Sequence, residues 1–239
     1  MYFRNNFVYV TQNKMAVFQL KNDFSFPPAH LSEPDGLLAV GGDLSLERLK
    51  LAYSQGIFPW FSGEEPILWW SPQPRFVLFP DELHVSNTMR QMLKKGIFKI
   101  TYNQCFDKVV DNCSKIMRKD QDGTWITSGM KAAFIDFHEA GYAQSVEVWQ
   151  DGELVGGLYG VGMGSCFFGE SMFAKVSNAS KAGFITFVNE FTKKGLELVD
   201  CQVHTPHLES LGAKMIDRDM FLALIKPRIL KTAPFKSYF

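Results

Sequence analysis

Apolar residues recur with helical spacing along much of the chain after residue 83. Phe106, Val109, Val110 and Cys113 follow an i, i+3, i+4, i+7 pattern, which places them on one face of a helix. Several such segments are followed closely by a glycine, and glycine favours the end of a helix. The pattern predicts helices over residues 86–95, 106–118, 130–139 and 178–194, the last of these capped by Asn178.

Between these helices, the apolar residues gather in short runs that are typical of strands. Asp151-Gly152 separates two of the runs and predicts a tight hairpin, because these residues tolerate a positive φ. Hairpins combined with a helical crossover predict an α+β domain with a mixed β-sheet. The predicted strands cover residues 98–102, 145–149, 153–159, 165–168 and 196–203.

Residues 24–80 have a different composition from the rest of the chain. They contain eight prolines and three of the five tryptophans, and proline at this density interrupts regular structure. One short helix is predicted over residues 47–53, between the N-cap Ser45 and Gly56. We therefore predict a small, irregular N-terminal domain (1–73) packed on a larger domain (74–239).

Charge and length restrict the class of protein. The 239 residues include 25 basic and 25 acidic side chains, so the chain lacks the basic average of many nucleic-acid-binding proteins. The four cysteines form no C-x-x-C pair and are expected to be reduced thiols. The N-terminus lacks the apolar core of a signal peptide, and no segment approaches about 18 apolar residues. We expect a soluble cytoplasmic protein that does not cross a membrane.

Three polar residues interrupt runs that are otherwise expected to be buried. Glu170 follows Phe167-Phe168-Gly169, and Asp200 and Gln202 are two residues apart in a predicted strand, which should place them on one face. An acid beside an amide can hold and orient an amine. Two structural explanations stand beside this one: Glu170 in an ion pair, and Asp200 and Gln202 capping loops at the end of a strand.

Other candidate chemistry has less support from the sequence. Five glycines between residues 156 and 164 lack the G-K-[ST] ending of a phosphate-binding loop, and close packing of strands explains them better. Cys201, His204 and His207 resemble metal ligands, but an intervening proline and the lack of a fourth ligand nearby argue against a site. The aspartate before Cys201 disfavours the thiolate that a nucleophile requires. We expect neither a metal nor a cofactor.

Two tryptophans and a basic cluster are candidates for contact with nucleic acid. Trp60 and Trp125 lie next to turn residues, where an indole ring can stack on a base, although filling a core is the more usual role of tryptophan. The basic cluster is either a patch that contacts phosphates or an ordinary solvated face. It consists of Arg90, Lys94, Lys95 and Lys99.

Several longer motifs are more specific than any of these single features. They are PDGLLAVGGDL at 34–44, GIFPWF at 56–61, PILWWSP at 66–72, GTWIT at 123–127, GESMF at 169–173, and DCQ at 200–202 followed by SLGA at 210–213. In this order and spacing, over about residues 16 to 225, they resemble the bacterial leucyl/phenylalanyl-tRNA-protein transferase family.

The resemblance implies an activity and a fold. Members of this family move Leu or Phe from aminoacyl-tRNA to the α-amino group of proteins that begin with Arg or Lys, which marks those proteins for degradation by the N-end rule. An apolar pocket discriminates weakly between apolar side chains, so less efficient transfer of Met is also expected. The implied fold is a small N-terminal domain on an N-acyltransferase-like (GNAT-like) domain. We expect a monomer.

The resemblance also assigns roles to individual residues. Trp60 and Trp125 match tryptophans that contact the terminal aminoacyl-adenosine, and Glu170, Asp200 and Gln202 match the polar catalytic centre. The positions that match the pocket for the Leu or Phe side chain are Leu158, Phe167, Met172, Phe187, Phe191 and Val199.

An aminoacyl ester is already activated, so its aminolysis requires chiefly a well-placed neutral amine. We hypothesise that Gln202 accepts a hydrogen bond from that amine, that Asp200 polarises and orients Gln202, and that Glu170 holds an amino group of one substrate. A CoA-dependent N-acetyltransferase is the alternative, although no glycine-containing phosphate loop precedes the helix at residue 178. A non-catalytic RNA-binding module is the third possibility.

Overall fold

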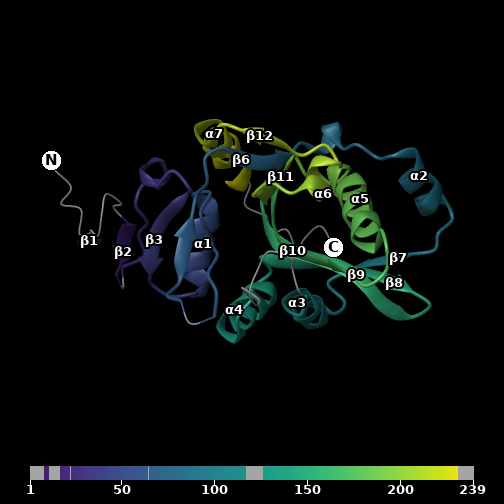
Figure 1. Ribbon diagram of the computed structural model, residues 1–239, viewed down its shortest axis with the longest axis horizontal. Helices are drawn as coiled ribbons and strands as arrows, with labels where there is room; N and C mark the ends of the chain where they lie inside the picture. The colour runs from purple at the N-terminus through teal and green to yellow at the C-terminus, as the bar shows by residue number, and fades with distance from the viewer. Residues whose placement is uncertain (1–7, 11–16, 22, 64, 117–125, 231–239) are drawn as a thin grey trace.

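Two β-sheets form the framework of the protein (Figure 1). The computed structural model describes residues 8–10, 17–21, 23–63, 65–116 and 126–230. The smaller sheet is built from strands within residues 8–70, and the larger sheet from strands within residues 75–216. This arrangement confirms the α+β class, with a small, irregular N-terminal part beside a larger mixed sheet.

The smaller sheet has short strands, as expected for a segment rich in proline. The helix α1 (Leu46–Ser54) follows its third strand and confirms the predicted helix, since the Ser45 side chain accepts a hydrogen bond from the Arg48 backbone N–H. Gly56, with φ +69°, follows the end of the helix. In spatial order, the strands are β1 (Val8–Val10), β2 (Val17–Leu20), β3 (Leu37–Gly41), β5 (Leu68–Trp70) and β4 (Phe58–Pro59).

The larger sheet is mixed. In spatial order, it contains β12 (Lys214–Ile216), β6 (Arg75–Leu78), β11 (Leu198–Gln202), β10 (Cys166–Ala174), β9 (Glu153–Met163), β8 (Ala143–Gln150) and β7 (Lys99–Tyr102). Among these strands, β10 and β11 run parallel and the other neighbours run antiparallel. The predicted hairpin at Asp151-Gly152 is confirmed, because both residues have positive φ and join β8 to β9.

Helices cover both faces of this sheet (Figure 1). The helices α3 and α4 pack on one side of β8 and β9, and α5 packs on the other. None of the helices within the described ranges is long and apolar enough to span a membrane. Beyond α1, the helices are α2 (Asn87–Lys94), α3 (Phe106–Ser114), α4 (Ser128–Glu139), α5 (Ala179–Thr192), α6 (Pro206–Glu209) and α7 (Arg218–Ile229).

Several helix boundaries differ from the prediction: α4 begins at Ser128 and not at residue 130, and α5 ends at Thr192 and not at residue 194. The helix predicted to extend to residue 118 ends at Ser114, and Lys115 is its C-cap. Asn178 precedes α5 but donates and accepts no side-chain capping bond, because its backbone is left-handed at φ +66° and not extended as a capping residue requires. Asparagine is among the few residues that tolerate this conformation.

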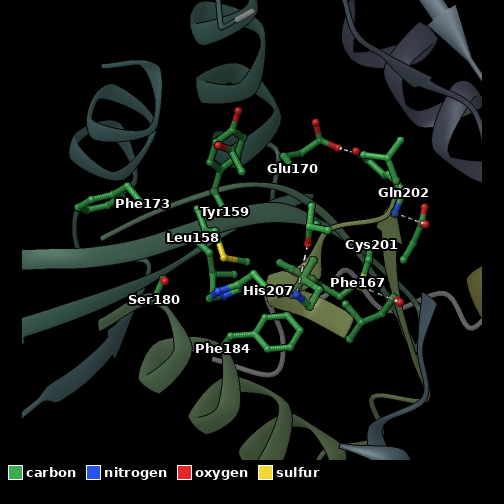
Figure 2. Close-up of a pocket in the computed structure, with 18 of the residues that line it drawn as sticks. Leu158, Tyr159, Phe167, Glu170, Phe173, Ser180, Phe184, Cys201, Gln202 and His207 are labelled. Carbon is green, nitrogen blue, oxygen red and sulfur yellow. Dashed lines mark hydrogen bonds between the residues drawn. The ribbon is translucent and has the colours of Figure 1, made fainter. Parts of the chain in front are cut away.

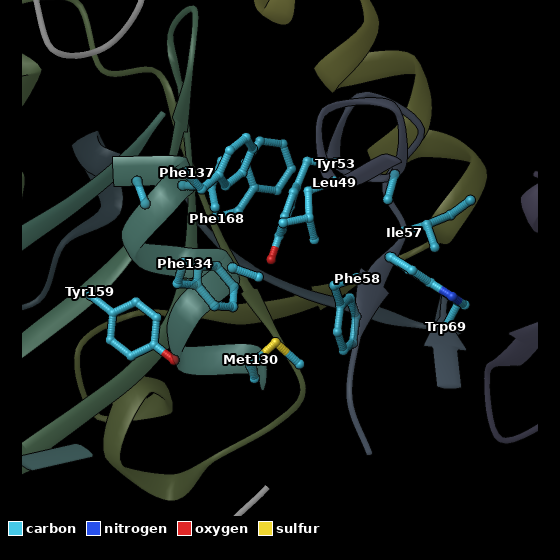
Figure 3. Close-up of a cluster of buried hydrophobic side chains, with 14 of the residues drawn as sticks. Leu49, Tyr53, Ile57, Phe58, Trp69, Met130, Phe134, Phe137, Tyr159 and Phe168 are labelled. Carbon is cyan, nitrogen blue, oxygen red and sulfur yellow. The ribbon is translucent and has the colours of Figure 1, made fainter. Parts of the chain in front are cut away.

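One hydrophobic core joins the two parts of the chain (Figure 3). Tyr53 of α1 lies against Phe137 of α4 and Phe168 of β10, with ring centroids 6.1 and 5.5 Å apart. Trp69 of the smaller sheet belongs to the same cluster of buried side chains. The N-terminal part is therefore packed directly on the larger sheet and not tethered through a linker.

The glycines of β9 allow the strands and rings beside them to approach closely. A Cβ atom at Gly160 would lie 2.3 Å from the carbonyl oxygen of Phe168 and 2.6 Å from the ring of Phe167. The expectation of close packing is confirmed for Gly160, and also for Gly156 and Gly157, where a Cβ atom would lie 2.8 Å from a neighbouring atom.

Replacing Gly160 by alanine should therefore lower the free energy of unfolding by about 1–3 kcal/mol, as overpacking of a core does. The matched control is Gly129→Ala in α4, where the nearest atom to the new Cβ is 3.9 Å away. That change should leave stability unchanged or raise it by up to about 1 kcal/mol. Urea unfolding followed by circular dichroism measures both, and equal stabilities for Gly160→Ala and the wild type would contradict the packing argument.

Candidate active site

A cavity of about 450 Å³ opens between the strands β9, β10 and β11 and the helices α5 and α6 (Figure 2). Its volume lies in the range of small-molecule sites. Apolar side chains form most of the wall, while Glu170 and Gln202 lie together at one side of it (Figure 2). The apolar wall includes Leu158, Phe167, Met172, Phe173, Phe184, Val199 and Leu208.

Glu170 is the central polar group of this cavity. It sits at a β-bulge in β10, between Gly169 and Ser171, so the strand departs there from regular alternation. Its Oε1 accepts a hydrogen bond from the Tyr53 hydroxyl at 2.8 Å and another from Gln202 Nε2 at 2.7 Å. Oε2 is buried and has no hydrogen-bond partner among the residues described. Burial raises the pKa of Glu170 to about 8, more than the two donors lower it.

Gln202 ends β11 in an unusual backbone conformation. Its φ is +63°, and the pairing of β11 with β6 shifts register between Asp200 and Gln202. The backbone N–H of Gln202 donates to Asp200 Oδ1 at 2.9 Å, which holds this turn in place. Glu170 Oε1 can accept a hydrogen bond whether the carboxyl is ionised or carries its proton on Oε2. The contact therefore orients the Gln202 amide with Nε2 toward Glu170 and leaves its oxygen available as an acceptor.

Asp200 is fixed by a buried ion pair with Arg75 of β6. The guanidinium donates to both carboxylate oxygens, at 2.8 and 2.6 Å, and each side chain is only 1% exposed. The rings of Phe58 and Phe221 lie 4.8 and 4.6 Å from the guanidinium carbon of Arg75. A bidentate pair enclosed by aromatic rings is among the best-defined charge contacts that a protein makes.

These contacts change two expectations drawn from the sequence. The ion pair suggested for Glu170 is made by Asp200, and Glu170 is bound by neutral donors. Asp200 orients Gln202 through the backbone N–H and not through the side-chain amide. Residues 199 to 203 all border the cavity. In a regular strand, only every second side chain would face it, and the register shift between Asp200 and Gln202 interrupts this alternation.

Four of the six predicted pocket residues line the cavity: Leu158, Phe167, Met172 and Val199. Phe187 and Phe191 are fully buried and are not among the lining residues. Phe187 packs behind Phe167, with ring centroids 4.6 Å apart, and Phe191 packs on Phe187. The reason is their position on α5: Phe184 borders the cavity, and residues three and seven positions later lie about 5 and 10 Å farther along the helix axis.

Of the predicted nucleic-acid contacts, those that the structure describes are not among the residues that line the cavity. Trp60 is partly buried, with its ring 5.8 Å from that of Trp70. Trp125 lies outside the described residues. The basic cluster is exposed on α2 and at the start of β7, and it consists of Arg90, Lys94, Lys95 and Lys99.

The weaker candidates gain no geometric support. Within the described ranges, no three His, Cys, Asp or Glu side chains are grouped so that they could hold a metal ion. His204 instead contacts Glu209 at 3.1 Å. Burial, and then the charge of Asp200, raise the pKa of the Cys201 thiol, so its thiolate is disfavoured.

Sequence reasoning missed two residues that hold the polar groups of this site. Tyr53 comes from α1 and Arg75 from β6, and they contact residues 117 and 125 positions away in the chain. Arg75 carried a signal, because it begins the apolar run Phe76-Val77-Leu78, where an unpaired charge would be costly. Tyr53 carried none, since a tyrosine on the buried face of a helix is common.

An apolar cavity beside a buried acid and amide is typical of an enzyme active site. Comparison with known families identifies the enzyme more closely. The chain belongs to the leucyl/phenylalanyl-tRNA protein transferase family: the family model matches residues 77–226, and the model of the family's N-terminal domain matches residues 42–73.

Curated relatives agree with this assignment. A Flavobacterium johnsoniae protein named leucyl/phenylalanyl-tRNA--protein transferase is 54% identical over 212 residues, which cover 89% of this chain and 100% of the relative. A Syntrophus aciditrophicus protein of the same name is 56% identical, over 89% of each chain. The protein is therefore a transferase.

Similarity to solved structures is weaker. A GCN5-related N-acetyltransferase from Kribbella flavida matches at a TM-score of 0.34 and 10% identity, over 70% of this chain and 59% of that one. L-PGS from Bacillus licheniformis matches at 0.38 and 12%, over 67% and 51%. TM-scores this low do not establish a common fold, and the α+β class follows from the two sheets and their helices.

The buried ion pair should be essential to stability. Arg75→Met would leave the Asp200 charge buried without its partner, and breaking such a pair typically costs about 3–5 kcal/mol. The control is Lys131→Met, which removes a partly exposed pair with Asp111 and should cost no more than about 1 kcal/mol. Chemical unfolding of both variants measures the difference, and equal losses would show that the Arg75–Asp200 pair is not the main constraint.

Proposed function

We propose that the protein moves Leu or Phe from aminoacyl-tRNA to the α-amino group of proteins that begin with Arg or Lys, and so marks them for degradation by the N-end rule. One observation carries the proposal: an apolar cavity adjoins a buried acid–amide cluster that can hold an amine. We also propose that the protein acts as a monomer in the cytoplasm, where charged tRNA is found.

The cavity accounts for the choice of amino acid. A cavity of about 150 Å³ lined by apolar side chains is large enough to bind benzene. The cavity of about 450 Å³ therefore has room for a Leu or Phe side chain and for the reacting groups beside it. Leu158, Phe167, Met172 and Val199 would contact that side chain, while Phe187 and Phe191 would support Phe167 from behind.

The polar cluster would place the attacking amine. With Nε2 of Gln202 held by Glu170, the amide oxygen can accept a hydrogen bond from an N–H of that amine. Asp200 would act through the backbone of Gln202, and Glu170 would hold the amino group with its unpartnered oxygen. Because an aminoacyl ester is already activated, correct placement of the amine is a large part of the catalysis required.

The remaining predicted contacts concern the tRNA. We propose that Trp60 and Trp125 stack on the terminal adenosine, and that the exposed cluster of Arg90, Lys94, Lys95 and Lys99 contacts phosphates. We further propose that the two sheets mark two domains, residues 1–73 and 74–239. Family membership favours this function over a CoA-dependent N-acetyltransferase or a non-catalytic RNA-binding module.

The direct test uses purified protein, labelled aminoacyl-tRNA and a peptide that begins with Arg. Transfer of Leu and Phe is expected. Met should also be transferred, because an apolar pocket discriminates weakly, but with a kcat/KM lower by about tenfold or more. The control peptide begins with acetylated Arg and should accept nothing. Binding of charged tRNA without any product would favour the RNA-binding module, and acetylation from acetyl-CoA would favour the acetyltransferase.

The role of Gln202 can be tested by two substitutions. Gln202→Ala removes the acceptor for the amine and should lower kcat by about 100-fold, the loss that misplacement of a reacting group can cause. Gln202→Glu places a second acid beside Glu170 and should be at least as damaging near pH 7. The control is Gln19→Ala, an exposed position in β2. Unchanged turnover in both Gln202 variants would remove this residue from the mechanism.

A further inference from the structure

Tyr53 reaches the candidate active site from the N-terminal part of the chain. Its side chain is 1% exposed, and its ring packs against Phe137 and Phe168 in the core (Figure 3). Only the hydroxyl extends into the site, where it donates to Glu170 Oε1 at 2.8 Å. A ring held this firmly defines the position of its hydroxyl and hence of the carboxyl group that accepts from it.

The two oxygens of Glu170 are therefore not equivalent. Oε1 is occupied by two donors, the Tyr53 hydroxyl and Gln202 Nε2. Oε2 is buried and has no partner in the part of the chain that the structure describes, although it belongs to a residue that borders the cavity. A buried carboxylate oxygen without a donor is costly unless a ligand supplies one.

We propose that Glu170 takes a proton from the α-ammonium group of the acceptor protein through Oε2, and that Tyr53 is a positioning residue which holds Oε1 and sets how strongly Glu170 binds that proton. This inference rests on the proposed function, because the ammonium group belongs to the acceptor substrate. It assigns a task to Tyr53 and a proton acceptor to the reaction.

The proton and bond changes balance. The ionised Glu170 carboxylate takes one proton from the ammonium group, which leaves a neutral amine and a neutral carboxyl group. The amine nitrogen then forms a bond to the ester carbonyl carbon, the bond from that carbon to the ribose oxygen breaks, and the second amine proton ends on the ribose oxygen. Glu170 releases its proton to water before the next cycle. No further reactant is required.

The surroundings of Glu170 suit this exchange. Burial raises its pKa to about 8, close to the value of about 7.7–8.0 for an α-amino group, so the proton passes between groups of similar affinity. Asp200 and Arg75 have opposite effects on this pKa, and they are paired with each other. The other titratable groups that line the cavity or act on the pKa of Glu170 are Tyr53 of α1, Arg75 of β6, Tyr159 of β9, Asp200 and Cys201 of β11, and His207 of α6.

Tyr53→Phe removes the hydroxyl and keeps the ring. Loss of a donor to the ionised carboxylate should raise the pKa of Glu170 by about one unit. The ratio of wild-type to variant kcat/KM should then be about tenfold at pH 7 and approach one near pH 9.5, with spontaneous ester hydrolysis subtracted. Tyr102→Phe is the matched control, because it removes a hydroxyl–carboxylate bond to Glu190 outside the site and should give a ratio near one at every pH.

A purely structural role for Tyr53 would give a ratio that does not change with pH, and that result would overturn the inference while leaving the proposed function standing. Absence of transfer by the wild type would overturn both. A second measurement does not depend on activity: carboxyl-¹³C glutamate NMR, with the Glu170 signal assigned by its loss in Glu170→Gln. A midpoint near 8 that rises in Tyr53→Phe supports the inference. A wild-type midpoint near 4.5 overturns it, even if Tyr53→Phe does not fold.

Discussion

The buried ion pair between Arg75 and Asp200 is the constraint on which the rest of the site depends. Removing two charges from water is costly, and good geometry offsets this cost. Here Arg75 binds both oxygens of Asp200, and Oδ1 also accepts the backbone N–H of Gln202, while Nη1 of Arg75 is buried without a hydrogen-bond partner among the described residues. The pair thus fixes a left-handed residue at the end of β11, and that residue in turn holds Glu170.

The same contacts connect parts of the chain that are far apart. Phe58 of the smaller sheet and Phe221 of α7 enclose the Arg75 guanidinium, and Tyr53 of α1 donates to Glu170. The N-terminal part therefore supplies a side chain to the site as well as packing area to the core. Loss of packing between the two sheets would therefore displace the groups that hold the carboxyl and amide.

The site combines two environments that favour different parts of one reaction. The apolar wall is suited to a large side chain, and it also keeps water from Glu170, so the carboxyl holds its proton more tightly than in solution. The two donors on Oε1 limit this effect and leave the carboxyl close in proton affinity to an amine. Burial and hydrogen bonding act in opposite directions, and their balance sets the chemistry available at Oε2.

The sequence by itself determined the local elements and the identity of the central polar groups. Ser45, Gly56 and Asp151-Gly152 act through contacts with near neighbours, so their helix and hairpin could be predicted. Glu170, Asp200 and Gln202 could be found because polar residues in apolar runs require partners. Only the tertiary structure decided which partners they have, that Phe187 lies behind the cavity wall, and that the strand bulges at Gln202. Gln202 contacts Glu170 across 32 positions, and Tyr53 and Arg75 contact residues 117 and 125 positions away, so short-range patterns do not encode these contacts.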